Sequence, residues 1–286
     1  MRWSFASIVL VPRGQQLAPP SAAERRRVFA WARDAGFSGV ELTAEWLDFF
    51  ALSDRALHEL ATEIGDAGLR VSGLNVPRCL FTCEPHAGRE FARVERALTV
   101  APLLGADVVN IALSLPLALN AERPPLRGAD APAEEHARAA KLVARLGRRA
   151  RAAGVTLVVE LHDDGLLDTP EFCLQLLERV NLPNVGINPD VANLCRDPGP
   201  LPDWRRAFEL LAPRTANWHV KNYRRAQPVS VPDGDIDYAV VWEIMRAAGY
   251  DGWVSIESRF GDVLAEQRTA LAYLKSLAAL AATQHL

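Results

Sequence analysis

Residues 153–162 are Ala-Gly-Val-Thr-Leu-Val-Val-Glu-Leu-His. A helical pattern runs up to Gly154, and glycine at such a position takes the left-handed conformation that ends a helix. The apolar, β-branched residues after it are typical of a buried strand, and the apolar run stops at Glu160. This order of helix, glycine, strand and charged residue predicts one unit of a parallel βα fold.

The same order recurs along the chain, with helix ends at Gly36, Gly68, Gly105 and Gly249. We expect strands near residues 5–11, 39–43, 70–76, 107–113, 156–162, 185–189, 215–221 and 252–257. We expect helices near residues 21–35, 53–67, 87–104, 134–153, 170–180, 203–212, 237–248 and 262–282. Eight alternating pairs predict a single-domain (β/α)8 TIM barrel over residues 1–286, rather than a doubly wound sheet with a Gly-x-Gly-x-x-Gly turn.

The charge and composition exclude several functions. A formal charge of −3 and a pI near 6.1 argue against a protein that binds nucleic acid through a basic surface. No apolar run approaches the roughly 20 residues of a membrane span, and residues 1–11 are better explained as a first strand than as a signal peptide. Cys79, Cys83, Cys173 and Cys195 lack zinc-site spacing, so we expect reduced thiols and a cytoplasmic protein.

Three of the predicted connections from strand to helix are long, at residues 12–20, 77–86 and 114–133. In a TIM barrel these loops build the active face. The 114–133 loop fits a lid and a plain surface insertion equally well.

Alternate side chains of a strand face the barrel interior and the helix layer. In the fifth strand Leu157, Val159 and Leu161 should face the helices, which leaves Glu160 and His162 inside. The same rule places His219 and Lys221 inside in the seventh strand, and Glu257 and Arg259 inside in the eighth. Polar residues of one parity at the C-terminal ends of strands are typical of an active site.

Four of these strand ends carry metal-ligand residues: Glu160, Asp190, His219 and Glu257. Buried carboxylates need a cation, so the alternative to a metal is a salt-bridge network with Lys221 and Arg259. Three carboxylates and one imidazole predict a single divalent ion, with Mn²⁺ favoured and Mg²⁺, Co²⁺ or Zn²⁺ as alternatives.

A metal held in this way can bind two adjacent oxygens of a hydroxy-carbonyl substrate and stabilise a cis-enediolate. Glu160 and Glu257 are the expected catalytic acid/base pair. Return of the proton to the opposite face of the same carbon gives epimerisation, and return to the next carbon gives isomerisation. Loss of a β-hydroxyl group gives dehydration.

The chain resembles the sugar phosphate isomerase/epimerase family of xylose-isomerase-like TIM barrels, which includes ketose 3-epimerases, hydroxypyruvate isomerase and inosose dehydratase. The resemblance covers nearly the whole chain, and five motifs carry it in order: Glu160-Leu-His162, Asp190-Val-Ala-Asn193, His219-Val-Lys-Asn222, Asp233-Gly-Asp-Ile-Asp-Tyr238 and Gly249-Tyr-Asp-Gly-Trp-Val-Ser-Ile-Glu257. It implies the same four metal ligands, proton transfer by both glutamates, and a dimer or tetramer.

Two positions depart from the family pattern. Asn193 stands where many members have a substrate-contacting His, and Asn222 stands where many have Asp. The resemblance also places Glu41, at the end of the second strand, near the substrate.

Glu41, Asn193 and Arg259 are therefore predicted substrate-binding residues. His162 is predicted to contact the substrate or to be a structural histidine. Lys221 is predicted to bind substrate oxygen or phosphate or to balance the charge of the site.

Together these features predict a metal-dependent isomerase or epimerase that acts on a small sugar, sugar phosphate or other hydroxy-carbonyl compound. A lyase of the inosose or dehydroshikimate dehydratase type is the alternative at the same site. A barrel that binds sugar without catalysis is the alternative from another class.

Overall fold

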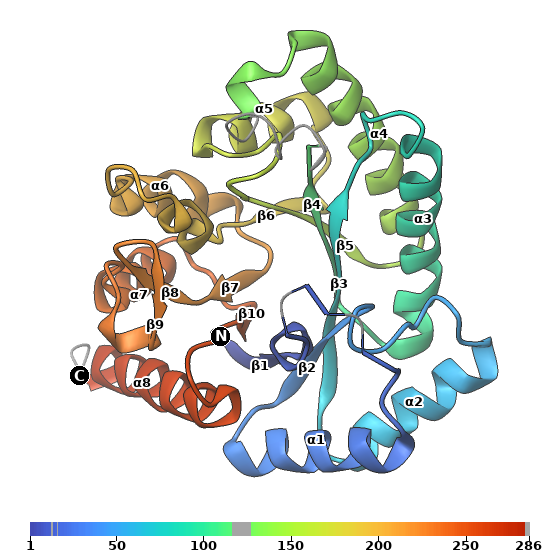
Figure 1. Ribbon diagram of the computed structural model, residues 1–286, viewed down its shortest axis with the longest axis vertical. Helices are drawn as coiled ribbons and strands as arrows, with labels where there is room; N and C mark the ends of the chain where they lie inside the picture. Colours follow the sequence, from blue (N-terminus) through green and yellow to red (C-terminus); the bar gives the residue numbers. More distant parts are fainter. Residues whose placement is uncertain (13, 16, 116–126, 284–286) are drawn as a thin grey trace.

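The strands form a nearly closed parallel barrel, and the helices lie around it (Figure 1). The computed structural model describes residues 1–12, 14–15, 17–115 and 127–283. The barrel strands are β1 (Arg2–Ala6), β2 (Gly39–Thr43), β3 (Arg70–Cys79), β4 (Val108–Leu113), β5 (Thr156–Glu160), β6 (Val185–Asn188), β7 (Trp218–Val220) and β10 (Trp253–Ile256).

The helices follow the strands in the predicted alternation. They are α1 (Ala22–Ala35), α2 (Asp54–Asp66), α3 (Ala87–Leu104), α4 (Ala133–Ala152), α5 (Pro170–Val180), α6 (Trp204–Leu211), α7 (Tyr238–Ala247) and α8 (Val263–Thr283). All five predicted helix-ending glycines have positive φ, from 65° to 97°. The predicted αβ turns and the (β/α)8 class are therefore confirmed.

Neighbouring strands pair in the order β6-β5-β4-β3-β2-β1-β10-β7. An isolated parallel bridge between Ile187 and Thr215 brings the β6 side of the sheet back to the chain that leads into β7. The pairing of β1 with β10 joins the two ends of the chain. All eight strands point the same way, so their C-terminal ends share one face of the barrel.

The first strand differs from its prediction over residues 5–11. Strand β1 ends at Ala6, and residues Ser7–Leu10 form a 3₁₀ turn. The carbonyls of Ile8 and Val11 accept hydrogen bonds from the Arg259 guanidinium rather than from a neighbouring strand. Val9 and Val11 are buried although they lie outside the sheet. Their burial explains why the apolar run in the sequence extends beyond the end of the strand.

A short hairpin after β7 was not predicted. Strands β8 (Asn222–Arg224) and β9 (Gln227–Val229) are antiparallel and lie outside the barrel sheet. Their two-residue turn is Arg225-Ala226, and both residues have positive φ. Turns of this kind usually contain glycine or asparagine, so the sequence lacks the usual hairpin signal.

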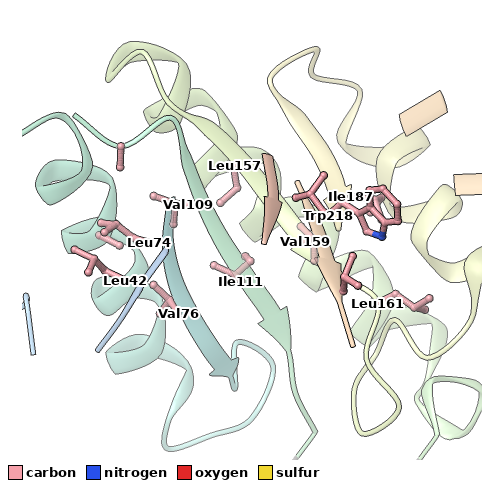
Figure 2. Packing of buried hydrophobic residues seen from close by; sticks show 14 of the residues in the cluster. Leu42, Leu74, Val76, Val109, Ile111, Leu157, Val159, Leu161, Ile187 and Trp218 are labelled. Carbon is pink, nitrogen blue, oxygen red and sulfur yellow. The ribbon is translucent and has the colours of Figure 1, made fainter. Parts of the chain in front are cut away.

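The outward faces of the strands pack against the helices through apolar side chains, including Val109, Leu157, Val159 and Trp218 (Figure 2). The inward faces carry many polar side chains among apolar ones such as Val158. Buried inward residues include Asn75, Asn110, Asn188 and Asn217. The barrel therefore has its apolar core between sheet and helices and a polar interior that leads to the C-terminal rim.

Residues 116–126 lie outside the described residues, so most of the predicted 114–133 lid or insertion does too. All four cysteines are free and buried. Within the described chain, no helix is both long and apolar enough to cross a membrane.

Candidate metal centre

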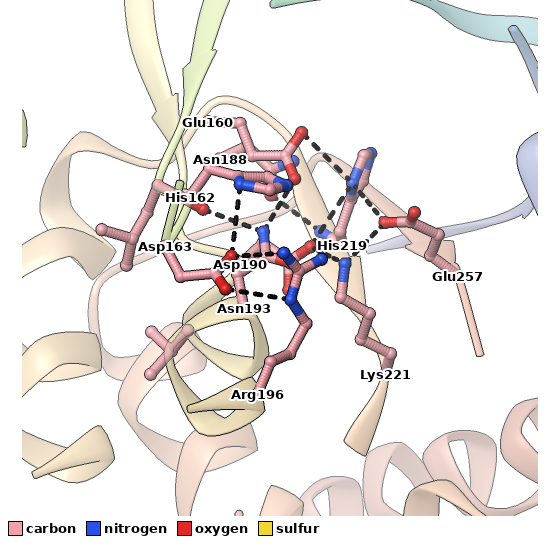
Figure 3. Close-up of polar contacts among 12 residues, drawn as sticks. Glu160, His162, Asp163, Asn188, Asp190, Asn193, Arg196, His219, Lys221 and Glu257 are labelled. Atoms are coloured by element: carbon pink, nitrogen blue, oxygen red, sulfur yellow. Dashed lines mark hydrogen bonds and ion pairs between the residues drawn. The ribbon is translucent and has the colours of Figure 1, made fainter. Parts of the chain in front are cut away.

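The four predicted metal ligands meet at the C-terminal end of the barrel (Figure 3). Glu160 ends β5, Asp190 follows β6, His219 lies within β7, and Glu257 follows β10. Each offers one ligand atom, and these atoms all lie within 4.8 Å of one another. Glu257 is partly buried, and the other three residues are buried. Parallel strands thus bring together residues that are far apart in the chain.

The two ring nitrogens of His219 face different partners. Nδ1 lies 3.2 Å from Glu257 Oε2, and it lies 3.8 Å from both Glu160 Oε2 and Asp190 Oδ2. Nε2 lies 3.0 Å from Glu41 Oε1. A carboxylate can only accept hydrogen bonds, so Glu41 holds a hydrogen on Nε2 and orients Nδ1 toward the cluster.

Glu41 is itself enclosed, with 1% of its surface exposed. Its Oε1 also accepts a hydrogen bond from Asn217 Nδ2 at 3.3 Å. Its observed partners are therefore His219 and Asn217, and contact with a substrate stays a prediction.

Lys221 lies between two of the carboxylates. Its Nζ donates to Asp190 Oδ2 at 2.6 Å and to Glu257 Oε2 at 3.0 Å. This geometry agrees with the predicted role of Lys221 in balancing the charge of the site. Its alternative role, binding substrate oxygen or phosphate, stays a prediction.

Burial and neighbouring charges shift the pKa values of the three carboxylates in different directions. Burial raises the pKa of Asp190 to about 7, although Lys221 opposes the shift. Burial also disfavours ionisation of Glu257, but the Lys221 ammonium and His219 hold its pKa well below the usual range. Burial likewise opposes ionisation of Glu160, and His219 lowers its pKa. Further positive charge would let all three carboxylates ionise together.

The residues present fit a divalent metal. Among the described residues, Asp190 Oδ1 is buried without a hydrogen-bond partner, and the only carboxylate oxygen within 3.5 Å of the buried His219 Nδ1 is Glu257 Oε2, at 3.2 Å. An unsatisfied buried polar atom costs about 1–3 kcal/mol. A cation between these atoms would remove that cost, and carboxylates with one imidazole suit Mg²⁺, Mn²⁺ or Zn²⁺.

His162 lies just beyond the end of β5, in a second acidic group. Its Nδ1 is 2.6 Å from Asp164 Oδ1, and Arg196 pairs with the neighbouring Asp163. Burial lowers the pKa of His162, but the hydrogen bond with Asp164 outweighs burial and raises it overall. The histidine is thus held by Asp164, and its contact with a substrate stays a prediction.

Asn193 and Arg259 also have protein partners. Asn193 Nδ2 donates to Glu160 Oε1 and to the Leu161 carbonyl, both at 3.0 Å. The Arg259 guanidinium donates to the Val11 and Ile8 carbonyls, both at 2.6 Å. Their predicted roles in substrate binding stay predictions.

The asparagines of the barrel interior were not predicted as site residues. Asn110 Nδ2 donates to Glu160 Oε2 at 2.8 Å, and Asn188 Oδ1 accepts from the His219 backbone N–H at 2.9 Å. The sequence carries a signal for them, because Asn110 interrupts an apolar strand and Asn188 ends one, each at an inward-facing position. Asn222 likewise has a clear contact, since its side chain bonds the Val231 and Ile236 carbonyls of the following loop.

A comparison with protein-family models decides the relationship. The xylose isomerase-like TIM barrel model matches residues 29–279. The chain belongs to the xylose isomerase-like TIM barrel family. The predicted family resemblance is confirmed.

Two named enzymes are similar to the chain over most of its length, and a third is similar over less than half of it. It is 27% identical over 254 residues to the provisionally named hydroxypyruvate isomerase of Streptomyces coelicolor, covering 82% of this chain and 85% of that protein. It is 25% identical over 256 residues to L-ribulose 3-epimerase of Mesorhizobium japonicum, covering 87% and 80%. Over 148 residues, 44% of this chain and 47% of the relative, it is 29% identical to inosose dehydratase of Lacticaseibacillus casei.

A solved structure supports the fold. A xylose isomerase-like TIM barrel protein from Mycobacterium smegmatis, in complex with magnesium, superimposes with a TM-score of 0.80 and 23% identity. The match covers 97% of this chain and 95% of that one. The family thus includes isomerases, epimerases and dehydratases on one barrel.

Proposed function

We propose that this protein is a divalent-metal-dependent isomerase or epimerase of a small sugar, sugar phosphate or related hydroxy-carbonyl compound. One observation carries the proposal: ligand atoms of Glu160, Asp190, His219 and Glu257 lie within 4.8 Å of one another at the C-terminal rim. The activities named for the relatives support the reaction class.

The metal would be held by those same four residues. A bound divalent ion supplies positive charge that polarises a substrate carbonyl and acidifies the neighbouring C–H bond. Mn²⁺ is the first ion to test, and Mg²⁺ is the second because a related barrel was solved with magnesium. Co²⁺ and Zn²⁺ complete the set.

Glu257 and Glu160 would transfer the proton. Both have lowered pKa values, with burial opposed by the charge of Lys221 or His219, so each is a carboxylate that can accept a proton. One glutamate would take the proton from a substrate carbon, leaving an enediolate. The other would return a proton from the opposite side of the substrate.

The remaining residues would bind and orient the substrate. Glu41 would act through His219, while His162, Lys221, Asn193 and Arg259 are the proposed contacts or supports around the substrate oxygens. We further propose a cytoplasmic homo-oligomer with a small polyol or sugar as its partner, without nucleic acid or membrane.

A lyase is the second candidate, because one relative is named as an inosose dehydratase. The same proton abstraction followed by loss of a β-hydroxyl group as water gives dehydration. The mass of the product distinguishes the two reactions, since only dehydration changes it.

The test is solvent deuterium incorporation, followed by NMR and mass spectrometry, with the Mn²⁺-loaded protein. The substrate panel is L-ribulose, D-fructose, hydroxypyruvate and a keto-inositol. Exchange at a carbon next to the carbonyl, with unchanged product mass apart from deuterium, supports the isomerase or epimerase. A non-catalytic barrel would show neither exchange nor dehydration with any substrate of the panel. It would still bind ligand, and Glu257→Gln would leave that binding unchanged.

A further inference from the structure

The carboxylate of Glu160 is fixed by two neutral amides. Asn110 Nδ2 donates to Oε2 at 2.8 Å, and Asn193 Nδ2 donates to Oε1 at 3.0 Å. Both asparagines are completely buried, and Glu160 is 5% exposed. Because each oxygen has its own donor on a different structural element, the plane of the carboxylate cannot turn without breaking a buried hydrogen bond.

Asn110 is itself held in place from both sides. Its Oδ1 accepts a hydrogen bond from Asn188 Nδ2 at 3.4 Å, and its Nδ2 also lies 3.3 Å from Asn75 Oδ1. Asn188 in turn accepts the backbone N–H of His219 at 2.9 Å. A row of amides from β4 to β6 therefore connects the orientation of Glu160 to the position of His219.

The other glutamate is held in a different way. Glu257 Oε2 accepts from the Lys221 ammonium, which carries a full positive charge. A neutral amide orients a carboxylate while leaving its negative charge uncompensated, whereas an ammonium cancels part of that charge. Glu160 is therefore oriented by neutral amides and Glu257 by a cation, while His219 Nδ1 lies near both carboxylates, at 3.8 Å and 3.2 Å.

A packing role alone does not account for Asn110. TIM-barrel interiors are usually filled by Val, Ile and Leu, and burying an amide is favourable only when its hydrogen bonds are made. Asn110 meets that condition because one of its bonds goes to Glu160.

We propose that Asn110 is a positioning residue that sets the orientation of Glu160 for metal binding and proton transfer. This role rests on the proposed function, which makes Glu160 a ligand and a proton-transfer group. Asn110 contacts neither metal nor substrate in this account and acts only through Glu160.

The experiment compares Asn110→Leu with Asn184→Leu. Both replace an amide by a side chain of similar size, but Asn184 precedes β6, at the opposite end of that strand from the metal centre, and its Nδ2 donates to the Gly147 carbonyl at 2.8 Å. The first measurement is the dissociation constant for Mn²⁺ by titration calorimetry. We expect Asn110→Leu to weaken binding by about 10–100-fold, as for other residues that orient metal ligands. We expect Asn184→Leu to bind as the wild type does.

The second measurement does not depend on metal. In EDTA, the free energies of unfolding of wild type, Asn110→Leu, Glu160→Gln and the double variant, measured by urea titration, form a thermodynamic cycle. We expect the changes caused by Asn110→Leu and Glu160→Gln to be non-additive, and those caused by Asn184→Leu and Glu160→Gln to add. If Asn110→Leu does not fold, Asn110→Ser replaces it, because the shorter hydroxyl loses the same contact with less disturbance.

The two measurements separate the two hypotheses. A wild type that binds no Mn²⁺ overturns the proposed function, and the cycle in EDTA still tests the contact between Asn110 and Glu160. Equal Mn²⁺ affinity for Asn110→Leu and wild type, or an additive cycle, overturns the positioning role even if the enzyme is active.

Discussion

The two ends of the barrel differ in how fully their carboxylates are paired with cations and hydrogen-bond donors. At the N-terminal end Asp107 accepts hydrogen bonds from Arg2, Arg70 and the Trp253 indole at 2.7–3.1 Å. The Arg2 guanidinium also lies 4.2 Å from the centre of the Trp253 ring. One acid there has two permanent cations and an indole donor.

The C-terminal end has the reverse balance. Glu41, Glu160, Asp190 and Glu257 converge there with one lysine and one histidine. The N-terminal cluster is satisfied by its own side chains, whereas the C-terminal cluster leaves buried ligand atoms without hydrogen bonds. The comparison shows that clustered charge alone is a weak sign of a functional site, and that the unsatisfied buried atoms of the C-terminal cluster are what support the proposed metal site.

The largest expected effect is on catalysis at the C-terminal end. Glu257→Gln removes a proton-transfer group and should lower the rate of carbon-bound hydrogen exchange by about 10²–10⁴-fold. Asp107→Asn, at the other end, should leave the rate unchanged. Equal exchange rates in Glu257→Gln and wild type, measured by NMR on the same substrate, would contradict the proposed proton-transfer role of Glu257.

Metal content should change only in variants that alter the C-terminal cluster. We expect about one divalent ion per chain in protein loaded with Mn²⁺, and loss of that ion in His219→Ala, because binding needs the assembled ligand set. His136→Ala is the matched control, since His136 stacks on Phe172 away from the cluster. Elemental analysis after desalting measures both variants. Retention of the ion in His219→Ala would contradict the assignment of this ligand.

Stability should depend more clearly on the N-terminal end. Asp107→Ala leaves the buried Trp253 indole without its acceptor, which should lower the free energy of unfolding by about 1–3 kcal/mol. The ion pairs to half-exposed Arg2 and Arg70 should add little. Urea unfolding compares this variant with Asp34→Ala, which breaks an exposed pair with Arg33. An equal loss in both variants would show that the indole contact contributes nothing.

The smallest effect is a dependence on pH at the C-terminal end. Burial raises the pKa of Asp164, but the hydrogen bond with His162 outweighs burial and lowers it overall. A carboxyl with a lowered pKa stabilises the fold above its unfolded pKa, near 4, and this contribution is lost as the pH falls through the folded value. Asp164→Asn should therefore lower the free energy of unfolding by about 1 kcal/mol at neutral pH. Unfolding curves at decreasing pH should show this difference shrinking, and a constant difference would contradict the ion-pair account.

The strand and helix order could be predicted because its signals are local. Helix-ending glycines, apolar runs and polar residues where those runs stop lie within a few residues of one another, as at Gly154 and Glu160. A parallel barrel then brings the C-terminal ends of all strands to one rim, so the convergence of the four predicted ligands followed from strand ends alone. The predicted end of β1 was wrong because buried apolar residues continue beyond the sheet. Local periodicity cannot distinguish a buried strand residue from a buried residue in the turn that follows it.

The partners of those residues were decided only by the tertiary structure. Glu41 and His219 are 178 residues apart, and Arg259 is 248 residues from Val11, whose carbonyl it binds. Asn110 meets Glu160 across 50 residues. Strand parity predicts that such side chains face the barrel interior, but which donor meets which acceptor depends on sheet register and barrel closure. Those are set by packing among all the strands and helices, so the sequence determined the residues at the rim and the fold determined how each one is held.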